Sequence, residues 1–365
     1  MQNIKAIVPA KDKWISICWQ VNDWCNFRCT YCSEWNWAGR NKNEHDIDLI
    51  VHTLEKIMLH YKDNGYKYFK LFLSGGEPTF WKGIIPVVEK FREIAEWPGS
   101  CVGINTNLSR PVSWWEEHHH LFEDVVASYH AEWTKEDKYI KSYNFLQDKK
   151  NYLCSRIMMH HEHFQQCIDF GDKIKDTCDN YMIEYAPVYD ELRPSTSPYF
   201  YEQEWQMDFF KTNSSARQQV VPIHKEPNYA WAKTHFEDDT IEPIDTNLII
   251  TEGKNFFKGW TCNIHESLHI HPNGRIQQAS CGVGPIVGNI VEGKFDIKLA
   301  EAIICPKTHC HCAADFNITK TIRLVSMSIK GDLDQTFKAV ESLLSKNGVF
   351  IFEDPSLAEV INNNS

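Results

Sequence analysis

The sequence predicts an α/β fold built on a parallel sheet. Apolar, strand-like runs occupy residues 14–21, 67–74, 101–107, 122–130, 152–159 and 181–188. Helix-like stretches at 47–61, 84–95, 135–149 and 163–178 lie between several of them. Strands that alternate with helices are joined by βαβ crossovers, which make neighbouring strands parallel. With 365 residues, the chain is long enough for one large domain and smaller additions.

Each predicted element has its own local pattern. Residues 14–21 are apolar overall, and Cys18 within them is expected to be a small buried side chain. The first helix is indicated by apolar residues at three- and four-residue steps, with Asp46 at its start and Gly65 just after its end. The apolar positions of the first two helices are Ile47, Ile50, Val51, Leu54, Ile57, Met58 and Tyr61, then Ile84, Val87, Val88, Phe91, Ile94 and Ala95.

Composition restricts the class of protein. The chain has 38 basic and 49 acidic residues and a formal net charge of -11, which does not favour general binding to nucleic acid or to anionic membranes. We find no apolar run long enough to span a membrane and no apolar core of a signal peptide, so a soluble, cytoplasmic protein is expected. Thirteen cysteines in such a chain indicate metal or redox chemistry more than disulfides.

Three of these cysteines form a compact motif. Cys25, Cys29 and Cys32 have CxxxCxxC spacing, and the aromatic Tyr31 directly precedes the last of them. Three thiolates can hold three corners of a four-iron, four-sulfur cluster and leave one iron open for chemistry. The alternatives are half of a zinc site, or a disulfide pair with an odd thiol.

The motif resembles that of the radical S-adenosylmethionine (radical SAM) superfamily, CxxxCxΦC with an aromatic residue at Φ. A second hallmark follows about one βα unit later, where Gly75-Gly76-Glu77-Pro78 resembles the family's GGEP segment. A glycine pair after a strand lets the backbone approach a ligand without interference from Cβ atoms. The resemblance implies a partial (β/α)6 TIM-like barrel, a 4Fe-4S cluster on the three cysteines and bound S-adenosyl-L-methionine (AdoMet).

Further cofactor-binding residues are expected where the strands end. The resemblance implies roles for Tyr31, Gly75, Gly76, Glu77, Pro78, Asn105, Ser128 and Arg156 in holding AdoMet. Arg156 and Glu184 are charged residues within apolar strands, and burying a charge is unfavourable unless it is paired. For Arg156, a contact with the cofactor carboxylate and a structural ion pair both remain open. His130 is expected to line the cleft. The histidine clusters at 118–120 and 160–163 are expected to lie on solvated faces.

A second group of cysteines follows in the C-terminal part: Cys262, Cys281, Cys305, Cys310 and Cys312. Residues 269–276 predict a β-hairpin with a Pro-Asn-Gly turn, whose strand pairing would bring Cys262 and Cys281 together. This arrangement resembles the SPASM or twitch extension of radical SAM enzymes and implies a second 4Fe-4S cluster. Cys305 with Cys310 or Cys312 is favoured to complete it. A four-cysteine zinc site is the alternative.

These predictions divide the chain into four parts. Residues 1–190 are the radical SAM core, 191–254 a connecting segment that covers the barrel, 255–320 a small α+β cysteine-rich domain, and 321–365 a C-terminal extension. Strands are expected near 322–328 and 348–352, a helical piece at 199–212 and a helix at 332–346.

The resemblance implies an oxidoreductase that cleaves AdoMet to a 5′-deoxyadenosyl radical and takes hydrogen from its substrate. The expected substrate is a peptide or protein that becomes oxidised or crosslinked, although the 24 residues before Cys25 are few for a leader-recognition domain. Oxidation of a small molecule, such as a sugar or a cofactor precursor, is the alternative. A non-catalytic iron-sulfur or zinc scaffold is the third hypothesis. Flavodoxin or ferredoxin is the expected kind of electron donor.

Overall fold

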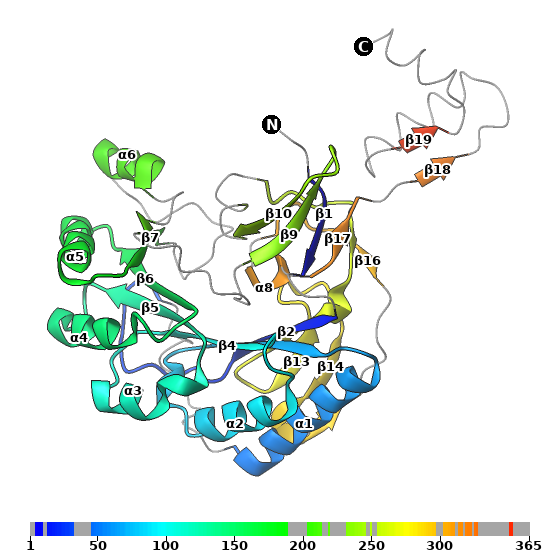
Figure 1. Ribbon diagram of the computed structural model, residues 1–365, viewed down its shortest axis with the longest axis horizontal. Helices are drawn as coiled ribbons and strands as arrows, with labels where there is room; N and C mark the ends of the chain where they lie inside the picture. The colour runs from blue at the N-terminus through cyan, green and yellow to red at the C-terminus, as the bar shows by residue number, and fades with distance from the viewer. Residues whose placement is uncertain are drawn as a thin grey trace, which may run out of the picture.

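The computed structural model of the protein describes residues 4–9, 13–32, 45–188, 203–213, 218–219, 231–245, 249, 254–296, 302–310, 313–316, 318–322, 325–327 and 350–352. Its strands form an eleven-stranded sheet, a six-stranded sheet and a two-stranded sheet. Helices and strands are mixed along the chain, so the predicted α/β class is confirmed. Figure 1 shows the described helices around the outside of the larger sheet and the second sheet beside it.

The centre of the larger sheet is six parallel strands in chain order: β2 Trp14–Gln20, β3 Tyr68–Ser74, β4 Cys101–Thr106, β5 Asp124–His130, β6 Tyr152–Met159 and β7 Met182–Pro187. Each pairs in parallel with the next, and all lie within two residues of the predicted runs. On their outer edges β2 pairs with β12 and β7 pairs with β8, Gln218–Gln219, so the described strands do not close into a barrel.

Five helices connect these strands: α1 Ile47–Asp63, α2 Ile84–Ile94, α3 Val112–His118, α4 Glu136–Leu146 and α5 Phe164–Thr177. The Asp46 side chain accepts a hydrogen bond from the Leu49 N–H and caps α1, as predicted. The apolar faces of α1 and α2 are buried against the sheet in one large core cluster. Helix α3 was not predicted, because seven residues after Pro111 are too few to show a helical period.

The predicted hairpin is present, but it does not form a separate sheet. Strands β12 Ser267–Ile270 and β13 Arg275–Gln278 pair antiparallel, and Gly274 in the turn has a φ of +82°. Strand β12 also pairs in parallel with β2, so the hairpin extends the central sheet. Strands β14 Ile286–Asn289 and β15 Lys294–Phe295 continue it outward. Leu268, Ile270 and Ile276 from the hairpin belong to the main core, which explains its position.

The second sheet has the order β10-β9-β1-β17-β11-β16. Its strands are β1 Ile4–Pro9, β9 Trp231–Phe236, β10 Ile241–Asp245, β11 Thr261–Cys262, β16 Ile303–Ile304 and β17 Lys320–Thr321. The N-terminal strand β1 therefore lies between segments from the C-terminal half, a pairing that no local sequence pattern indicates.

The remaining elements are short. They are α6 Glu204–Asn213, α8 Ala313–Phe316, the parallel pair β18 Val325–Met327 and β19 Phe350–Phe352, and the 3-10 helices Pro78–Phe80, His119–Leu121, Ile264–Glu266 and Ile290–Glu292. Helix α6 agrees with the helical piece expected at 199–212, and β18 and β19 agree with the two C-terminal strands. The helix expected at 332–346 lies outside the described residues.

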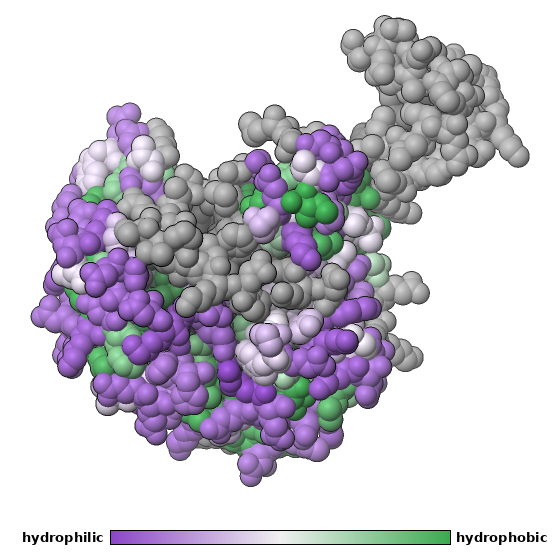
Figure 2. Space-filling model, viewed as in Figure 1, coloured by the Kyte–Doolittle hydropathy of each residue, from purple (hydrophilic) through white to green (hydrophobic). Residues whose placement is uncertain are grey.

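The exterior is mainly polar. Figure 2 shows hydrophilic residues over most of the described surface in this view, with hydrophobic residues scattered between them. None of the described helices is long and apolar enough to cross a membrane.

Candidate cofactor site

A pocket lies at the carboxyl ends of the parallel strands. Its cavity measures about 260 Å³. The lining residues come from the cysteine loop and from the ends of β3 to β6: Cys25, Phe27, Cys29, Tyr31, Cys32, Gly75, Gly76, Asn105, Thr106, Asn107, Ser128, His130, Arg156 and Met158. The carboxyl edge of a parallel sheet is the usual position of a ligand site.

The cysteine loop follows β2 directly, and its three cysteines line this pocket. Its turn is closed by the Cys32 N–H, which donates to the Cys29 carbonyl at 3.1 Å. The Phe27 N–H donates to Cys25 Sγ at 3.3 Å, and Asn107 Nδ2 donates to the same sulfur at 3.7 Å. Burial, with Glu77 as a second cause, raises the pKa of the Cys25 thiol to about 12. The Cys25 thiol therefore needs a cationic partner to become a thiolate, and an iron cluster would supply one.

The glycine turn after β3 packs directly against Asn22. Gly75 has a φ of +133°, and a Cβ atom on it would lie 2.5 Å from the Asn22 carbonyl oxygen and 2.8 Å from Oδ1. The Gly76 N–H donates to both of these oxygens, at 3.1 and 3.0 Å. Both the backbone conformation and the close approach require glycine at position 75.

Glu77 does not line the pocket, and it ties the strand ends together. Its carboxylate is fully buried and accepts hydrogen bonds from Thr79 N at 3.1 Å and Thr79 Oγ1 at 2.6 Å. It also accepts from Thr106 Oγ1 and Asn107 N, both at 2.7 Å. The Glu77 N–H donates to the Trp24 carbonyl, just before the first motif cysteine. Burial raises the pKa of this carboxyl group although four donors oppose the rise.

His130 at the end of β5 contacts the cysteine loop. Its Nδ1 lies 2.5 Å from the Tyr31 hydroxyl and 3.5 Å from Cys29 Sγ. Burial lowers the pKa of His130 to about 4, so the ring is neutral near pH 7. Burial raises the pKa of Tyr31, so its hydroxyl keeps its proton and shares a hydrogen bond with His130 Nδ1.

The other strand-end residues are paired with one another. Ser128 Oγ donates to Asn105 Oδ1 at 3.1 Å. Arg156 contacts Glu184 on the adjacent strand through Nε and Nη2, both 3.0 Å from Oε2. Arg156 thus forms the ion pair foreseen as one of its two roles and still lines the pocket.

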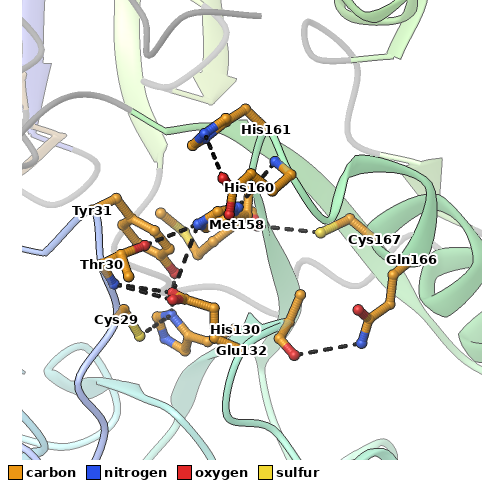
Figure 3. Close-up of polar contacts among 12 residues, drawn as sticks. Cys29, Thr30, Tyr31, His130, Glu132, Met158, His160, His161, Gln166 and Cys167 are labelled. Carbon is orange, nitrogen blue, oxygen red and sulfur yellow. Dashed lines mark hydrogen bonds and ion pairs between the residues drawn. The ribbon is translucent and has the colours of Figure 1, made fainter.

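The loop is also held through Thr30. Glu132 accepts from the Thr30 N–H, and His160 Nε2 lies 3.0 Å from Thr30 Oγ1 (Figure 3). The expectation that residues 160–163 form a solvated face is wrong for His160, which is 2% exposed. The reason is that β6 ends beside the cysteine loop and the His160 ring packs against Tyr31, with ring centroids 5.7 Å apart.

Three of the C-terminal cysteines lie close together, but the strand that carries Cys262 is not the one that was predicted. Cys262 lies in β11 of the second sheet rather than in the hairpin ladder, and it packs in one apolar cluster with Cys281 and Cys305. Cys310 belongs to the neighbouring cluster, and Cys312 lies outside the described residues. The reason for the difference is that β12 is paired with β2, which leaves Cys262 to a separate strand.

A buried lysine accompanies these thiols. Burial acts against the charge of Lys320, but Cys310 and Cys262, followed by Asp315, raise the pKa of its ammonium group. The Asp315 carboxylate accepts hydrogen bonds from the Cys281 N–H and the Ser280 side chain, both at 2.8 Å. Four thiolates on iron-sulfur or zinc carry net negative charge, which a buried ammonium group balances, so the residues fit either metal site.

The structure brings most of the predicted cofactor-site residues into one pocket: Cys25, Cys29, Cys32, Tyr31, Gly75, Gly76, Asn105, Ser128 and Arg156 line it. Glu77 and Pro78 are buried and do not line it. Sequence reasoning missed Asn22, Phe27 and Met158. Asn22 was detectable in principle, because it is a polar residue directly after an apolar strand, as Asn105 is at the end of another.

Comparison with known proteins agrees with this geometry. Residues 19–127 match a family model described as the radical SAM superfamily, which runs from the end of β2 into β5 and includes both motifs but less than a third of the chain. The chain contains a radical SAM domain. This domain includes the cysteine loop, the glycine turn and Asn105.

One curated relative and several solved structures are similar to the chain. A GTP 3',8-cyclase from Pectobacterium atrosepticum is 28% identical over 98 residues, which cover 27% of this chain and 29% of that protein. The aligned segment thus spans less than a third of the relative. Among solved structures, native anSMEcpe with bound AdoMet has a TM-score of 0.43 at 13% identity, covering 76% of this chain and 78% of that one. BtrN in complex with AdoMet and 2-DOIA has a TM-score of 0.35 at 13% identity, covering 76% and 79%. A likeness this low does not place individual residues.

Proposed function

We propose that the protein is a radical SAM enzyme that binds a 4Fe-4S cluster on Cys25, Cys29 and Cys32 and cleaves AdoMet reductively. One observation carries this proposal: the three cysteines and the Gly75-Gly76 turn line the same pocket at the carboxyl ends of the strands. When bound, the cluster supplies an electron to AdoMet, which yields methionine and a 5′-deoxyadenosyl radical. Three cysteines leave one iron without a protein ligand, which is where AdoMet would attach.

The residues of the chain would bind and orient AdoMet. The backbone of Gly75 and Gly76 is open to the pocket and offers polar groups without a side chain in the way. Asn105 and Ser128 add side-chain oxygen and nitrogen atoms, and Arg156 adds positive charge for a carboxylate. Tyr31, Phe27 and Met158 give the pocket apolar walls that exclude water from a reactive radical. The six parallel strands that carry these residues support the proposal of a partial TIM-like barrel.

For the second cysteine group we propose an auxiliary 4Fe-4S cluster on Cys262, Cys281, Cys305 and either Cys310 or Cys312. Its support is the joint packing of the first three, with Cys310 and the buried Lys320 nearby. Such a cluster would accept an electron from the substrate radical and make the net reaction an oxidation. A zinc site on the same thiols remains the alternative, because both metals prefer four thiolates.

For the substrate we propose a peptide or protein that is oxidised or crosslinked, with flavodoxin or ferredoxin as the electron donor in the cytoplasm. The support is the resemblance of the C-terminal cysteines to SPASM and twitch extensions. A small molecule is the second candidate, and it is favoured by the similarity to a GTP 3',8-cyclase within the radical SAM domain.

The decisive experiment is anaerobic reconstitution with iron and sulfide, followed by an assay for 5′-deoxyadenosine with AdoMet and a reductant. We expect the wild type to form it, and Cys25→Ala, Cys29→Ala or Cys32→Ala to abolish formation. Cys178→Ala is the matched control, because Cys178 is a buried cysteine that ends α5 and does not line the pocket. Formation of 5′-deoxyadenosine at the wild-type rate by any motif variant would overturn the proposal.

A further inference from the structure

Thr30, between Cys29 and Tyr31, is held from two sides by residues that follow β5 and β6. Its N–H donates to the Glu132 carboxylate, 3.1 Å from Oε2 and 3.4 Å from Oε1. Its hydroxyl lies 3.0 Å from His160 Nε2. Figure 3 shows Glu132 and His160 facing the loop from the strand side. Glu132 does not line the pocket, so it acts on the site through the loop.

The hydrogen bonds of His160 define its tautomer. Its Nδ1 accepts from the Glu162 N–H at 3.1 Å, so in the neutral ring the proton is on Nε2, which donates to Thr30 Oγ1. Side-chain ligand atoms of His160, Glu162 and His163 lie within 4.8 Å of one another, as in a metal site. A metal ion on His160 would have to break one of its two hydrogen bonds, so these three residues are not a ready metal site.

Glu132 brings negative charge to the cysteine loop. Its side chain is 14% exposed, and the His160 Nε2 atom lies 3.9 Å from Oε2. The carboxylate accepts from the backbone N–H of the residue directly after Cys29, so its charge lies beside a proposed iron ligand.

Two properties of Glu132 would each lower the reduction potential of an iron-sulfur cluster on the loop. Reduction adds an electron, and a nearby negative charge makes this addition less favourable. Hydrogen bonds from the protein to cluster sulfurs make reduction easier, and Glu132 directs the Thr30 N–H to its own carboxylate instead.

We propose that Glu132 is a positioning residue that fixes the cysteine loop through Thr30 and lowers the reduction potential of the cluster held by Cys25, Cys29 and Cys32. The inference rests on the proposed function. A lower potential makes the reduced cluster a stronger electron donor, which the cleavage of AdoMet requires. His160 supports the same arrangement from the hydroxyl side of Thr30.

The test is a redox titration of the reconstituted protein, in which electron paramagnetic resonance measures the amount of reduced cluster. Glu132→Gln keeps an oxygen that can accept from Thr30 and removes the charge. At a fixed potential we expect the ratio of reduced to oxidised cluster to rise about tenfold, which is about 59 mV for one electron. Glu162→Gln is the matched control, since it makes the same change at a side chain that is 72% exposed, and it should leave the ratio unchanged.

Two further variants separate charge from structure. Glu132→Asp keeps the charge and should leave the ratio close to that of the wild type. Glu132→Ala removes both charge and acceptor, and it should release iron faster than Glu132→Gln. An unchanged potential in Glu132→Gln, with the iron content intact, would overturn the inference and leave the proposed function standing. A wild type that holds no four-iron cluster on the motif cysteines would overturn both.

Discussion

The most direct test of the strand-end arrangement is Glu77→Gln, which changes a buried carboxylate into an amide of the same size. Oε1 of Glu77 accepts three hydrogen bonds and Oε2 accepts one from the Asn107 N–H. The amide oxygen can replace Oε1. The amide nitrogen must then face the Asn107 N–H, which is 2.7 Å from Oε2 in the wild type. Two donors would point at each other without an acceptor.

The expected loss of stability follows from these contacts. A hydrogen bond to a charged group contributes about 1.5–3 kcal/mol, and an unsatisfied buried donor costs about 1–3 kcal/mol. Removing the charge offsets part of this loss, because burial already disfavours the carboxylate and raises the pKa of Glu77. We therefore expect Glu77→Gln to lower the free energy of unfolding by about 2–4 kcal/mol.

The measurement is urea unfolding of the protein without iron, with tryptophan fluorescence as the signal. The signal is the sum of thirteen tryptophans and reports global unfolding, to which the buried Trp81 beside the Pro78–Phe80 turn contributes. The control Glu162→Gln should stay within about 0.5 kcal/mol of the wild type, as surface substitutions usually do. A Glu77→Gln variant as stable as the wild type would refute the view that this carboxylate holds the strand ends together.

Three further predictions follow from the structure. Gly75→Ala should weaken AdoMet binding at least tenfold with the iron content retained, because the new Cβ atom would displace the Asn22 backbone at 2.5 Å; isothermal titration calorimetry measures this, and unchanged affinity would contradict it. Burial, then His271, lowers the pKa of His269 to about 4 from its usual 6.5, so the unfolded chain binds the extra proton first. Stability should therefore fall by up to about 3 kcal/mol as the pH drops from 6.5 to 4; His269→Gln should flatten this part of the pH profile, and an equally steep profile would count against the assignment. The double variant Cys262→Ala, Cys281→Ala should reduce the iron content from about eight to about four atoms per chain while slow AdoMet cleavage persists; about four irons and one zinc in the wild type would identify the alternative zinc site.

The central strands could be predicted because their sequences are unambiguous. Strands buried on both faces are continuous apolar runs, and β2 to β7 all lie within two residues of such runs. In a parallel sheet the carboxyl ends of the strands lie along one edge, so the residues at these ends could be predicted to lie near one another. This is why Asn105, Ser128 and Arg156 could be placed near the cysteines before their contacts were known.

The long-range pairings could not be predicted in this way. Ser267 lies opposite Ser16 because β12 is added to the edge of β2, and strand pairing across so many residues leaves no local pattern. The same holds for Thr30, whose partners Glu132 and His160 come from two other strand ends. A histidine cluster with no apolar period looks solvated in sequence, and only the position of β6 beside the cysteine loop shows that His160 is buried.

The role of Glu77 shows why the two motifs occur together in one chain. Its backbone N–H is bonded to Trp24 at the start of the cysteine loop, and its carboxylate is bonded to Thr106 and Asn107 at the end of β4. Asn107 in turn donates to Cys25 Sγ, so one buried carboxylate fixes the position of a proposed iron ligand through a single intermediate residue. The Glu77 side chain thus reaches the cysteine loop through Asn107 and not through the pocket. The backbone of Gly75 and Gly76 lines the pocket. A change at Glu77 should therefore disturb the cysteine loop and the glycine turn together.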